Sequence, residues 1–83
     1  MRAVDACLVE VVKVAHAQAA VDEIDDQLCR LAAELNRAPP AQKAQLAVEI
    51  RQLRQEALPT AMAALAAARR ALQACRGRGE GLG

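Results

Sequence analysis

The chain contains no phenylalanine, tryptophan or tyrosine among its 83 residues. It therefore lacks the aromatic rings on which many nucleic-acid-binding proteins stack bases. Its net charge is only +1, so no overall field attracts nucleic acid or an anionic membrane. An alanine-rich chain without aromatics also lacks the residue runs that strands use. These absences argue against a nucleic-acid-binding protein and against a β-sheet fold.

Histidine and cysteine are too sparse and too scattered to build a reactive site. His16 is the one histidine, and the cysteines Cys7, Cys29 and Cys75 stand far apart with no Cys-x-x-Cys pair. This spacing does not match a zinc site, and no nucleophile and base are paired as catalysis requires. We therefore expect no metal, no cofactor and no catalytic residue, and we expect the three cysteines to be free thiols packed as small apolar side chains.

Long apolar runs are also missing. The first 20 residues are mostly apolar, but Asp5, Glu10 and Lys13 interrupt them. A secretory signal needs an uninterrupted apolar core of about 7–15 residues, and a membrane-spanning helix needs about 20. The sequence therefore predicts no export signal and no membrane insertion, and we expect a cytoplasmic protein.

The chain does contain regularly spaced apolar residues. Alanine supplies 21 of its 45 apolar residues, so 24 larger side chains remain to fill a core. In the first half they recur at alternating steps of three and four, which is the heptad pattern of packed helices. We expect a helix over about residues 3–36. Its stripe is Val14, Ala17, Val21, Ile24, Leu28, Leu31 and Leu35, continued upstream through Val11, Leu8 and Val4.

The sequence predicts a turn over residues 37–40 and a second helix over about 41–75. Pro39 and Pro40 end the first helix, because a proline forces its preceding residue out of the helical conformation. Pro59 falls where the stripe shows extra steps of four, so the second helix is predicted to be kinked or split there. Alternate glycines then predict a flexible tail over 77–83. The second stripe is Leu46, Ile50, Leu53, Ala57, Ala61, Leu65, Ala68, Leu72 and Cys75.

Two long helices joined by a short turn predict an all-α fold, an antiparallel, coiled-coil-like hairpin over residues 1–76. A turn centred between Ala38 and Pro39 places residue i opposite position 77 − i. The acidic run from Asp22 to Asp26 then lies opposite Arg51 and Arg54. Residues 1–37 carry 4 basic and 7 acidic groups, and residues 38–76 carry 6 basic and 2 acidic groups. We expect the opposite charges to favour this pairing.

A further set of apolar residues lies mostly outside these stripes and predicts a partner. A two-helix hairpin buries one stripe on each helix, so additional apolar positions imply another surface to be covered. The partner is predicted to be either another helical protein or a second copy of this chain, and not nucleic acid. The expected contact residues are Val9, Val12, Val48, Leu58, Met62 and Leu65, of which Leu65 also belongs to the second stripe.

The run Val21–Leu28, VDEIDDQL, resembles the start of the all-helical chorismate mutases, whose first helix reads Ile-Asp-x-Ile-Asp-x-x-Leu. The resemblance implies an enzyme whose arginines and lysine hold two substrate carboxylates. Two of those arginine positions fall on Gln18 and about Leu35 in this chain. Neither side chain can form a bidentate pair with a carboxylate. We therefore do not expect an enzyme, and mutase activity remains the least favoured alternative.

The architecture and length resemble the E component of type III secretion needle assemblies, short Ala/Leu-rich helical hairpins with a turn like Arg37–Pro40. The resemblance spans about residues 14–72. It implies a cytoplasmic co-chaperone that, with a helical-repeat partner, keeps a needle subunit soluble before export. The sequence thus predicts a non-catalytic interaction module, most concretely a secretion co-chaperone. A self-associating four-helix bundle with a structural or regulatory role is the alternative.

Overall fold

Two helical arms make up the computed structural model, which describes the backbone of residues 7–82 and the side chains of residues 7–78. The first arm is α2 (Leu8–Arg37). The second comprises α3 (Pro40–Gln52), the π-helix η1 (Leu53–Ala57) and α4 (Leu58–Leu82). The all-α prediction is confirmed over this range.

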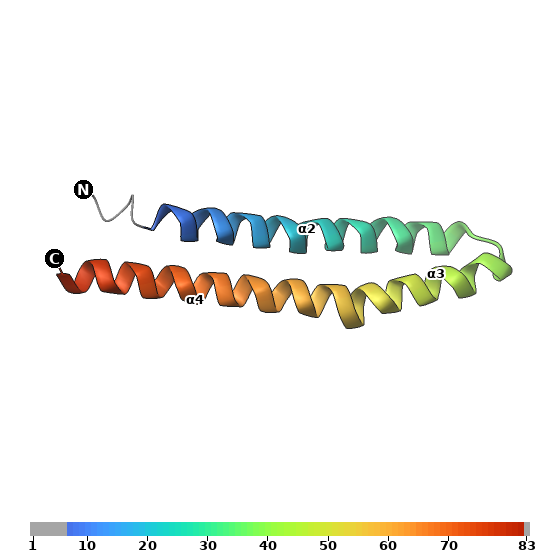
Figure 1. The fold of residues 1–83 in the computed structure, drawn as a ribbon. Coiled ribbons are helices and arrows are strands. Elements are labelled where there is room, and N and C mark those ends of the chain that lie inside the picture. Colours follow the sequence, from blue (N-terminus) through green and yellow to red (C-terminus); the bar gives the residue numbers. More distant parts are fainter. Residues whose placement is uncertain (1–6, 83) are drawn as a thin grey trace.

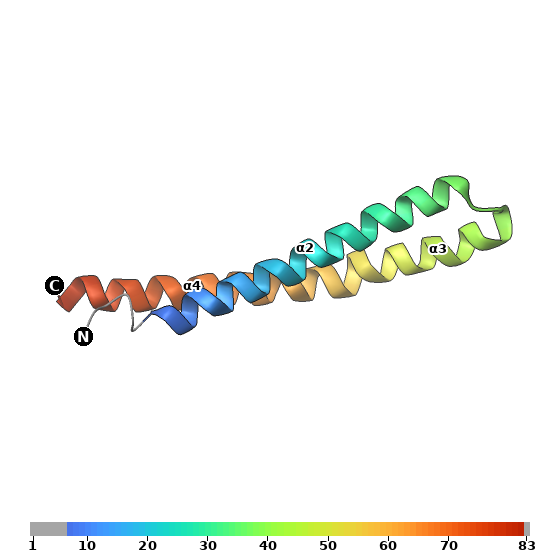
Figure 2. The same ribbon diagram turned by 90° about the horizontal axis from the view of Figure 1, so that it is seen from above.

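The arms lie side by side and run in opposite directions (Figure 1), in a molecule of 62 × 16 × 12 Å. From above, they cross at a shallow angle and separate toward the turn (Figure 2). This arrangement is compatible with the predicted hairpin.

The turn is made by two extended residues, Ala38 (φ −75°, ψ 150°) and Pro39 (φ −63°, ψ 158°). Each precedes a proline, and the proline ring disfavours the helical conformation in the residue before it. Pro40 then begins α3, where its missing N–H costs no helical hydrogen bond. The Pro39 carbonyl accepts hydrogen bonds from the backbone N–H groups of Gln42 and Lys43, both at 3.0 Å. The turn therefore follows directly from the consecutive prolines.

The ends of the helices differ in part from the predicted bounds. The expected start at residue 3 lies outside the described residues, and α2 begins at Leu8, after its N-cap residue Cys7. The expected end at Cys75 is wrong, because α4 continues to Leu82. Within 7–82 no glycine has a positive φ. A glycine costs a helix about 1 kcal/mol relative to alanine, which weakens a helix without ending it.

The second arm continues through Pro59 without a break. The residues just before it form the π-helix Leu53–Ala57, and the Leu58 N–H donates to the Leu53 carbonyl five residues back. A π-turn takes one residue more than an α-turn, which accommodates the successive steps of four from Leu53 to Ala57, Ala61 and Leu65. It also widens the backbone where the proline ring would collide with a carbonyl four residues earlier. The predicted irregularity is thus in the right place, and the structure is compatible with a kink and not with two separate helices.

Replacing Pro59 with alanine should stabilise the chain by about 1 kcal/mol. Alanine restores a backbone donor and has a helix propensity about 3 kcal/mol better than proline. The extra freedom of the unfolded chain and the existing π-turn offset most of that gain. Urea denaturation followed by circular dichroism measures the change. A loss of stability would show that the π-turn needs the proline.

The core is a single seam between the arms. Every stripe residue predicted from Val14 to Leu35 on the first arm and from Leu46 to Cys75 on the second is at least half-buried. Among the described side chains the buried hydrophobic ones are Cys7, Leu65 and Cys75, each 7–8% exposed, and none is below 2%. A pair of helices has only one shared face, so little of the apolar surface is enclosed.

The seam takes a different path at the start of α2 than the sequence stripe predicts. Leu8 and Val11 are exposed, whereas Cys7 is buried and Glu10 is half-buried. Continuing the regular steps of four and three backward from Val14 leads to Glu10 and Cys7. The charged Glu10 disguised this continuation, and the prediction followed the valine and leucine nearby. Val4 lies outside the described residues.

The predicted register between the arms is wrong by five to ten residues. The 77 − i rule places Cys7 opposite position 70, but Cys7 is bridged to Cys75. It places Gln18 opposite position 59, but Gln18 is hydrogen-bonded to Arg69. The rule assumed a symmetric turn and a uniform α-helix. The extended Ala38–Pro39 link moves the start of the second arm, and the π-turn adds one residue to it.

Candidate interaction surface

The terminal groove is a shallow hollow on the outer side of α2 close to the chain ends. It is lined by Leu8, Val9, Val12, Lys13 and His16, with a volume of about 530 Å³. Leu8, Val9 and Val12 are 56%, 59% and 46% exposed. These positions face away from the seam because Cys7 and Glu10 occupy it. Aliphatic side chains thus form an exposed apolar surface where a helix normally presents polar groups.

The other predicted contact residues do not join this groove. Val48 lies on α3 near the turn and is exposed, whereas Cys75, next to the groove, is 27 positions further along the same arm. At about 1.5 Å per residue, that places Val48 about 40 Å from the groove. Met62 is exposed on α4, about 20 Å along the arm from Cys75. The apolar residues predicted as one surface are therefore distributed along the rod.

Two of the predicted contact residues belong to the seam. Leu65 is 7% exposed and Leu58 is half-buried. The π-helix η1 ends immediately before Leu58 and contains one residue more than an α-helical turn would. This extra residue changes the direction in which Leu58 points and brings it toward the seam. The Leu65 side chain is already covered within the hairpin, so it offers little surface to a partner.

A small polar network links α2 to α4 in the half of the hairpin farther from the turn. The Arg69 guanidinium donates to the Gln18 side-chain oxygen at 3.1 Å, and the Gln18 amide donates to Asp22 at 3.1 Å. No ion pair joins the acidic residues 22–26 to Arg51 or Arg54, all of which are described and exposed. The predicted pairing fails because the register is shifted, so that Arg51 and Arg54 are no longer opposite the acidic run.

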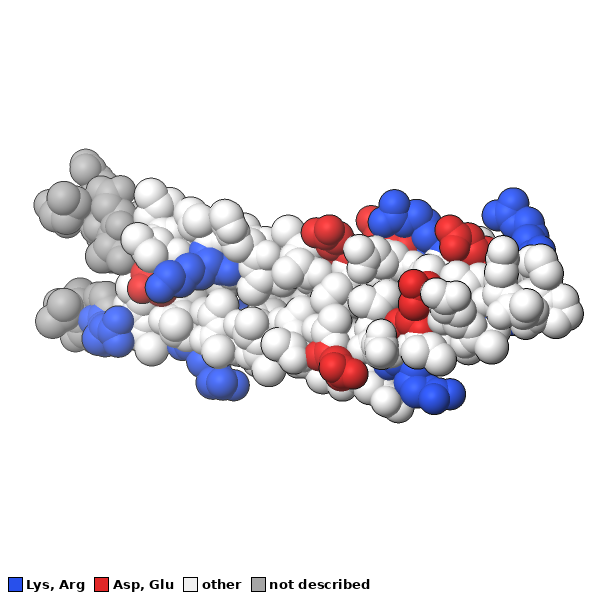
Figure 3. Space-filling view, turned by 45° about the vertical axis from the view of Figure 1, so that its right-hand side comes forward, with Lys and Arg blue, Asp and Glu red and all other residues white. Residues whose placement is uncertain are grey.

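Charged side chains leave much of the surface uncovered. On the face in Figure 3, wide areas without Lys, Arg, Asp or Glu separate the charged groups. The exposed alanines of α4 include Ala63, Ala64, Ala66 and Ala67. Small side chains keep this part of the α4 surface flat, so a neighbouring helix could approach the α4 backbone closely.

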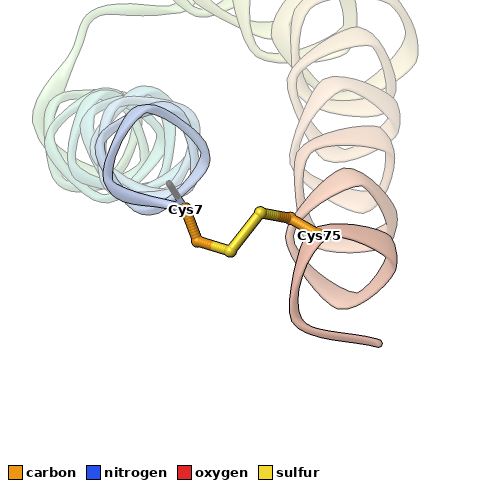
Figure 4. The surroundings of a disulfide bond; sticks show 2 residues. All are labelled: Cys7 and Cys75. Atoms are coloured by element: carbon orange, nitrogen blue, oxygen red, sulfur yellow. A yellow bond between two sulfur atoms is a disulfide. The ribbon is translucent and has the colours of Figure 1, made fainter. Parts of the chain in front are cut away.

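A disulfide bond joins Cys7 to Cys75 and ties the two arms together near the chain ends (Figure 4). The Cα atoms are 5.9 Å apart, and the residues are 68 positions apart in the sequence. The expectation of free thiols is therefore wrong for both residues. Cys29 is free, as expected, but its side chain is exposed and not packed in the core. Both bridged cysteines occupy seam positions, so stripes correctly extended would have placed them at the same end.

Two further hollows lie between the arms in the half near the turn, with volumes of about 710 and 570 Å³. They share Glu34 and Glu49. The larger is lined mainly by polar side chains around Leu31, Leu53 and Ala57, and its lining contains one arginine, Arg30. Binding two carboxylates in the mutase manner requires several cationic groups. This lining does not offer them.

The remaining candidate ligands do not gather into a site. Within residues 7–82, no three His, Cys, Asp or Glu side chains are placed to hold a metal ion. His16 lines the terminal groove and Cys29 lies exposed in the middle of α2. Leu8 was not predicted to line the groove, because its spacing assigned it to the stripe.

Comparison with known proteins adds no relative. The chain matches no protein-family model, and no curated protein or solved structure is significantly similar to it. Within the described residues, no helix combines the length and the apolar character needed to cross a membrane.

Proposed function

We propose that the chain is a non-catalytic interaction module that binds a helical partner at the terminal groove. The observation that carries the proposal is the exposure of Leu8, Val9 and Val12 together on one face of a rod that has almost no enclosed core. Exposed apolar clusters of this kind are typical of interaction surfaces. The antiparallel hairpin is the rigid support that presents them.

The groove alone provides only part of a stable interface. Fully burying an aliphatic side chain contributes about 1.5–3 kcal/mol, and these three are already about half covered. Covering the rest contributes about 3 kcal/mol, whereas micromolar affinity needs about 8 kcal/mol. The partner therefore also contacts surface beyond these three side chains. A helix is the element that best fits a helical face.

In its most concrete form, the proposal is a secretion co-chaperone that covers an aggregation-prone helical subunit, as the resemblance to type III secretion needle components implies. An apolar groove and an alanine face support such a role. The Cys7–Cys75 disulfide weighs against a cytoplasmic location, because structural disulfides persist mainly in oxidising compartments. A chaperone acting outside the reducing cytoplasm accommodates both observations.

The second candidate is a four-helix bundle made from two copies of the chain. The opposite net charges of the two arms favour it, since residues 1–37 carry an excess of 3 acidic groups and residues 38–76 an excess of 4 basic groups. A second copy can place each acidic arm beside a basic one. Sedimentation equilibrium of the purified chain separates the candidates. A stable dimer favours the bundle, and a monomer favours a different partner.

Replacing Val9 and Val12 with glutamate should weaken partner binding at least tenfold while leaving helicity unchanged. Two carboxylates would have to lose their hydration on docking. The partner is identified by affinity capture from the native host, then purified, and its binding is measured by titration calorimetry. Val48→Glu is the matched control, because Val48 is a similarly exposed valine about 40 Å away. Equal affinity of the double variant and the native chain would refute the groove as the docking site.

A further inference from the structure

We infer that the Cys7–Cys75 disulfide is a redox latch that keeps the terminal groove in its docking form. The inference rests on the proposed function for the role of the groove, and the latch itself stands on separate observations. The bridge joins the two ends of a chain segment of 68 positions across the open end of the hairpin (Figure 4). Oxidation closes that end, and reduction releases it.

The bridge is placed directly at the start of the groove. Cys7 is the N-cap residue of α2, Leu8 is its first helical residue, and the Val11 N–H donates to the Cys7 carbonyl at 3.0 Å. The first turn of α2 therefore carries both the bridge and the first groove residue. The Cys7 side chain forms no capping hydrogen bond at this helix end. Fixing Cys7 to the other arm is thus what holds this turn in place.

Packing at this end is too weak to replace the bridge. Two of the three buried hydrophobic residues in the described chain are the bridged cysteines themselves. The next seam position along α2 is Glu10, whose Oε1 is buried and has no hydrogen-bond partner among the described residues. Beyond it, Val14 and Leu72 are only half-buried, and Ala17 and Ala68 offer little apolar area. A buried carboxylate oxygen and small side chains favour separation of the arms once the covalent link is gone.

The chemistry is a thiol–disulfide exchange that balances with a protein disulfide as oxidant. The thiolate of one cysteine attacks the oxidant's disulfide and forms a mixed disulfide. The second cysteine then attacks the sulfur of the first, which forms the Cys7–Cys75 bond and releases the oxidant as a dithiol. Two electrons and two protons pass from the chain to the oxidant. Oxidising compartments supply such disulfide donors, so the latch is closed there and open in a reducing one.

Cys29 provides an internal control for this chemistry. It is exposed and free on α2, whereas Cys7 and Cys75 are buried in the seam. A chain folded under oxidising conditions should therefore react with an alkylating reagent at Cys29 alone, and at all three cysteines after reduction. Mass spectrometry of the alkylated chain counts these thiols. Three reactive thiols before reduction would overturn the latch.

The structural effect is tested in a Cys29→Ser background, which prevents exchange with the free thiol. The oxidised chain is compared with the same chain in a dithiol reductant and with the Cys7→Ser, Cys75→Ser variant. Opening a loop of this length should lower the melting temperature by about 15 °C or more. Hydrogen exchange over residues 8–16 should rise at least tenfold, whereas exchange near the turn should change little. Unchanged exchange over residues 8–16 would overturn the latch.

Binding separates failure of the latch from failure of the proposed function. The reduced chain and the double serine variant should bind the purified partner at least tenfold more weakly than the oxidised chain. Equal binding in both states would overturn the gating and leave the groove as the docking site. If the oxidised chain binds no partner, and Val9→Glu, Val12→Glu changes nothing, the proposed function fails and the gating fails with it. The hydrogen-exchange measurement over residues 8–16 still decides whether the bridge holds the start of α2 in place.

Discussion

Replacing Leu65 with alanine is expected to cause the largest loss of stability of any single truncation of an aliphatic side chain in the described part of the chain. Leu65 is the one large aliphatic residue buried in the seam, at 7% exposure. Truncating a buried leucine to alanine costs about 2–5 kcal/mol, because apolar contact is lost and a cavity remains. For a domain of this size, about 3 kcal/mol lowers the melting temperature by about 15 °C. Thermal unfolding followed by circular dichroism at 222 nm measures the shift.

The matched control is Met62→Ala, three residues earlier on the same helix. Met62 is 54% exposed, so its truncation removes little buried surface and should change stability by less than about 0.5 kcal/mol. Both substitutions introduce alanine into an α-helical position, so the difference between them reports burial alone. Equal shifts in the two variants would show that Leu65 is not enclosed by the other arm.

The contrast between these residues shows what the sequence could predict. The steps of three and four from Val14 to Leu35, and from Leu46 to Cys75, correctly identified the least exposed face of each arm. Helical periodicity is a local property, so a single sequence reveals it directly. The same applies to the turn, since consecutive prolines act only on their own neighbours.

The relation between the arms was harder to predict. A register depends on every residue in the connection and on every deviation from α-helical rise. The extended Ala38–Pro39 link and the π-turn at Leu53–Ala57 each shift it. The irregular steps near Pro59 marked the place of the π-turn but not its geometry. The prediction placed Arg51 and Arg54 opposite the acidic run, whereas the observed shift of five to ten residues places about positions 56–65 there.

The disulfide and the groove were missed for one shared reason. At Glu10 the periodic pattern contains a charged residue, and the prediction turned there toward Val11 and Leu8 instead of Cys7. That choice hid a bridged cysteine and assigned a groove residue to the core. Periodicity should have outweighed side-chain polarity, since Glu10 does occupy the seam. A charged residue at a seam position thus marks a place where the helical periodicity predicts burial but the side chain itself does not stabilise the packed helices.

Replacing Glu10 with leucine should therefore stabilise the hairpin by about 1–2 kcal/mol. The substitution removes a buried carboxylate oxygen that has no hydrogen-bond partner in the described part of the chain, and it adds apolar area on the seam beside the bridge. The gain is expected to be larger after reduction, when packing alone must hold the arms together at that end. Urea denaturation of the oxidised and reduced chains measures both values.

Glu23→Leu is the control for Glu10→Leu, because Glu23 is an exposed glutamate on the same helix. It makes the same chemical change without a seam contact, so it should alter stability by less than about 0.5 kcal/mol. If Glu10 faces the second arm, Glu10→Leu should stabilise the chain more than Glu23→Leu does, in both the oxidised and the reduced state. A destabilised Glu10→Leu chain would mean that the carboxylate has a stabilising partner, and that the first turns of α2 are held by polar contacts and not only by the Cys7–Cys75 bridge.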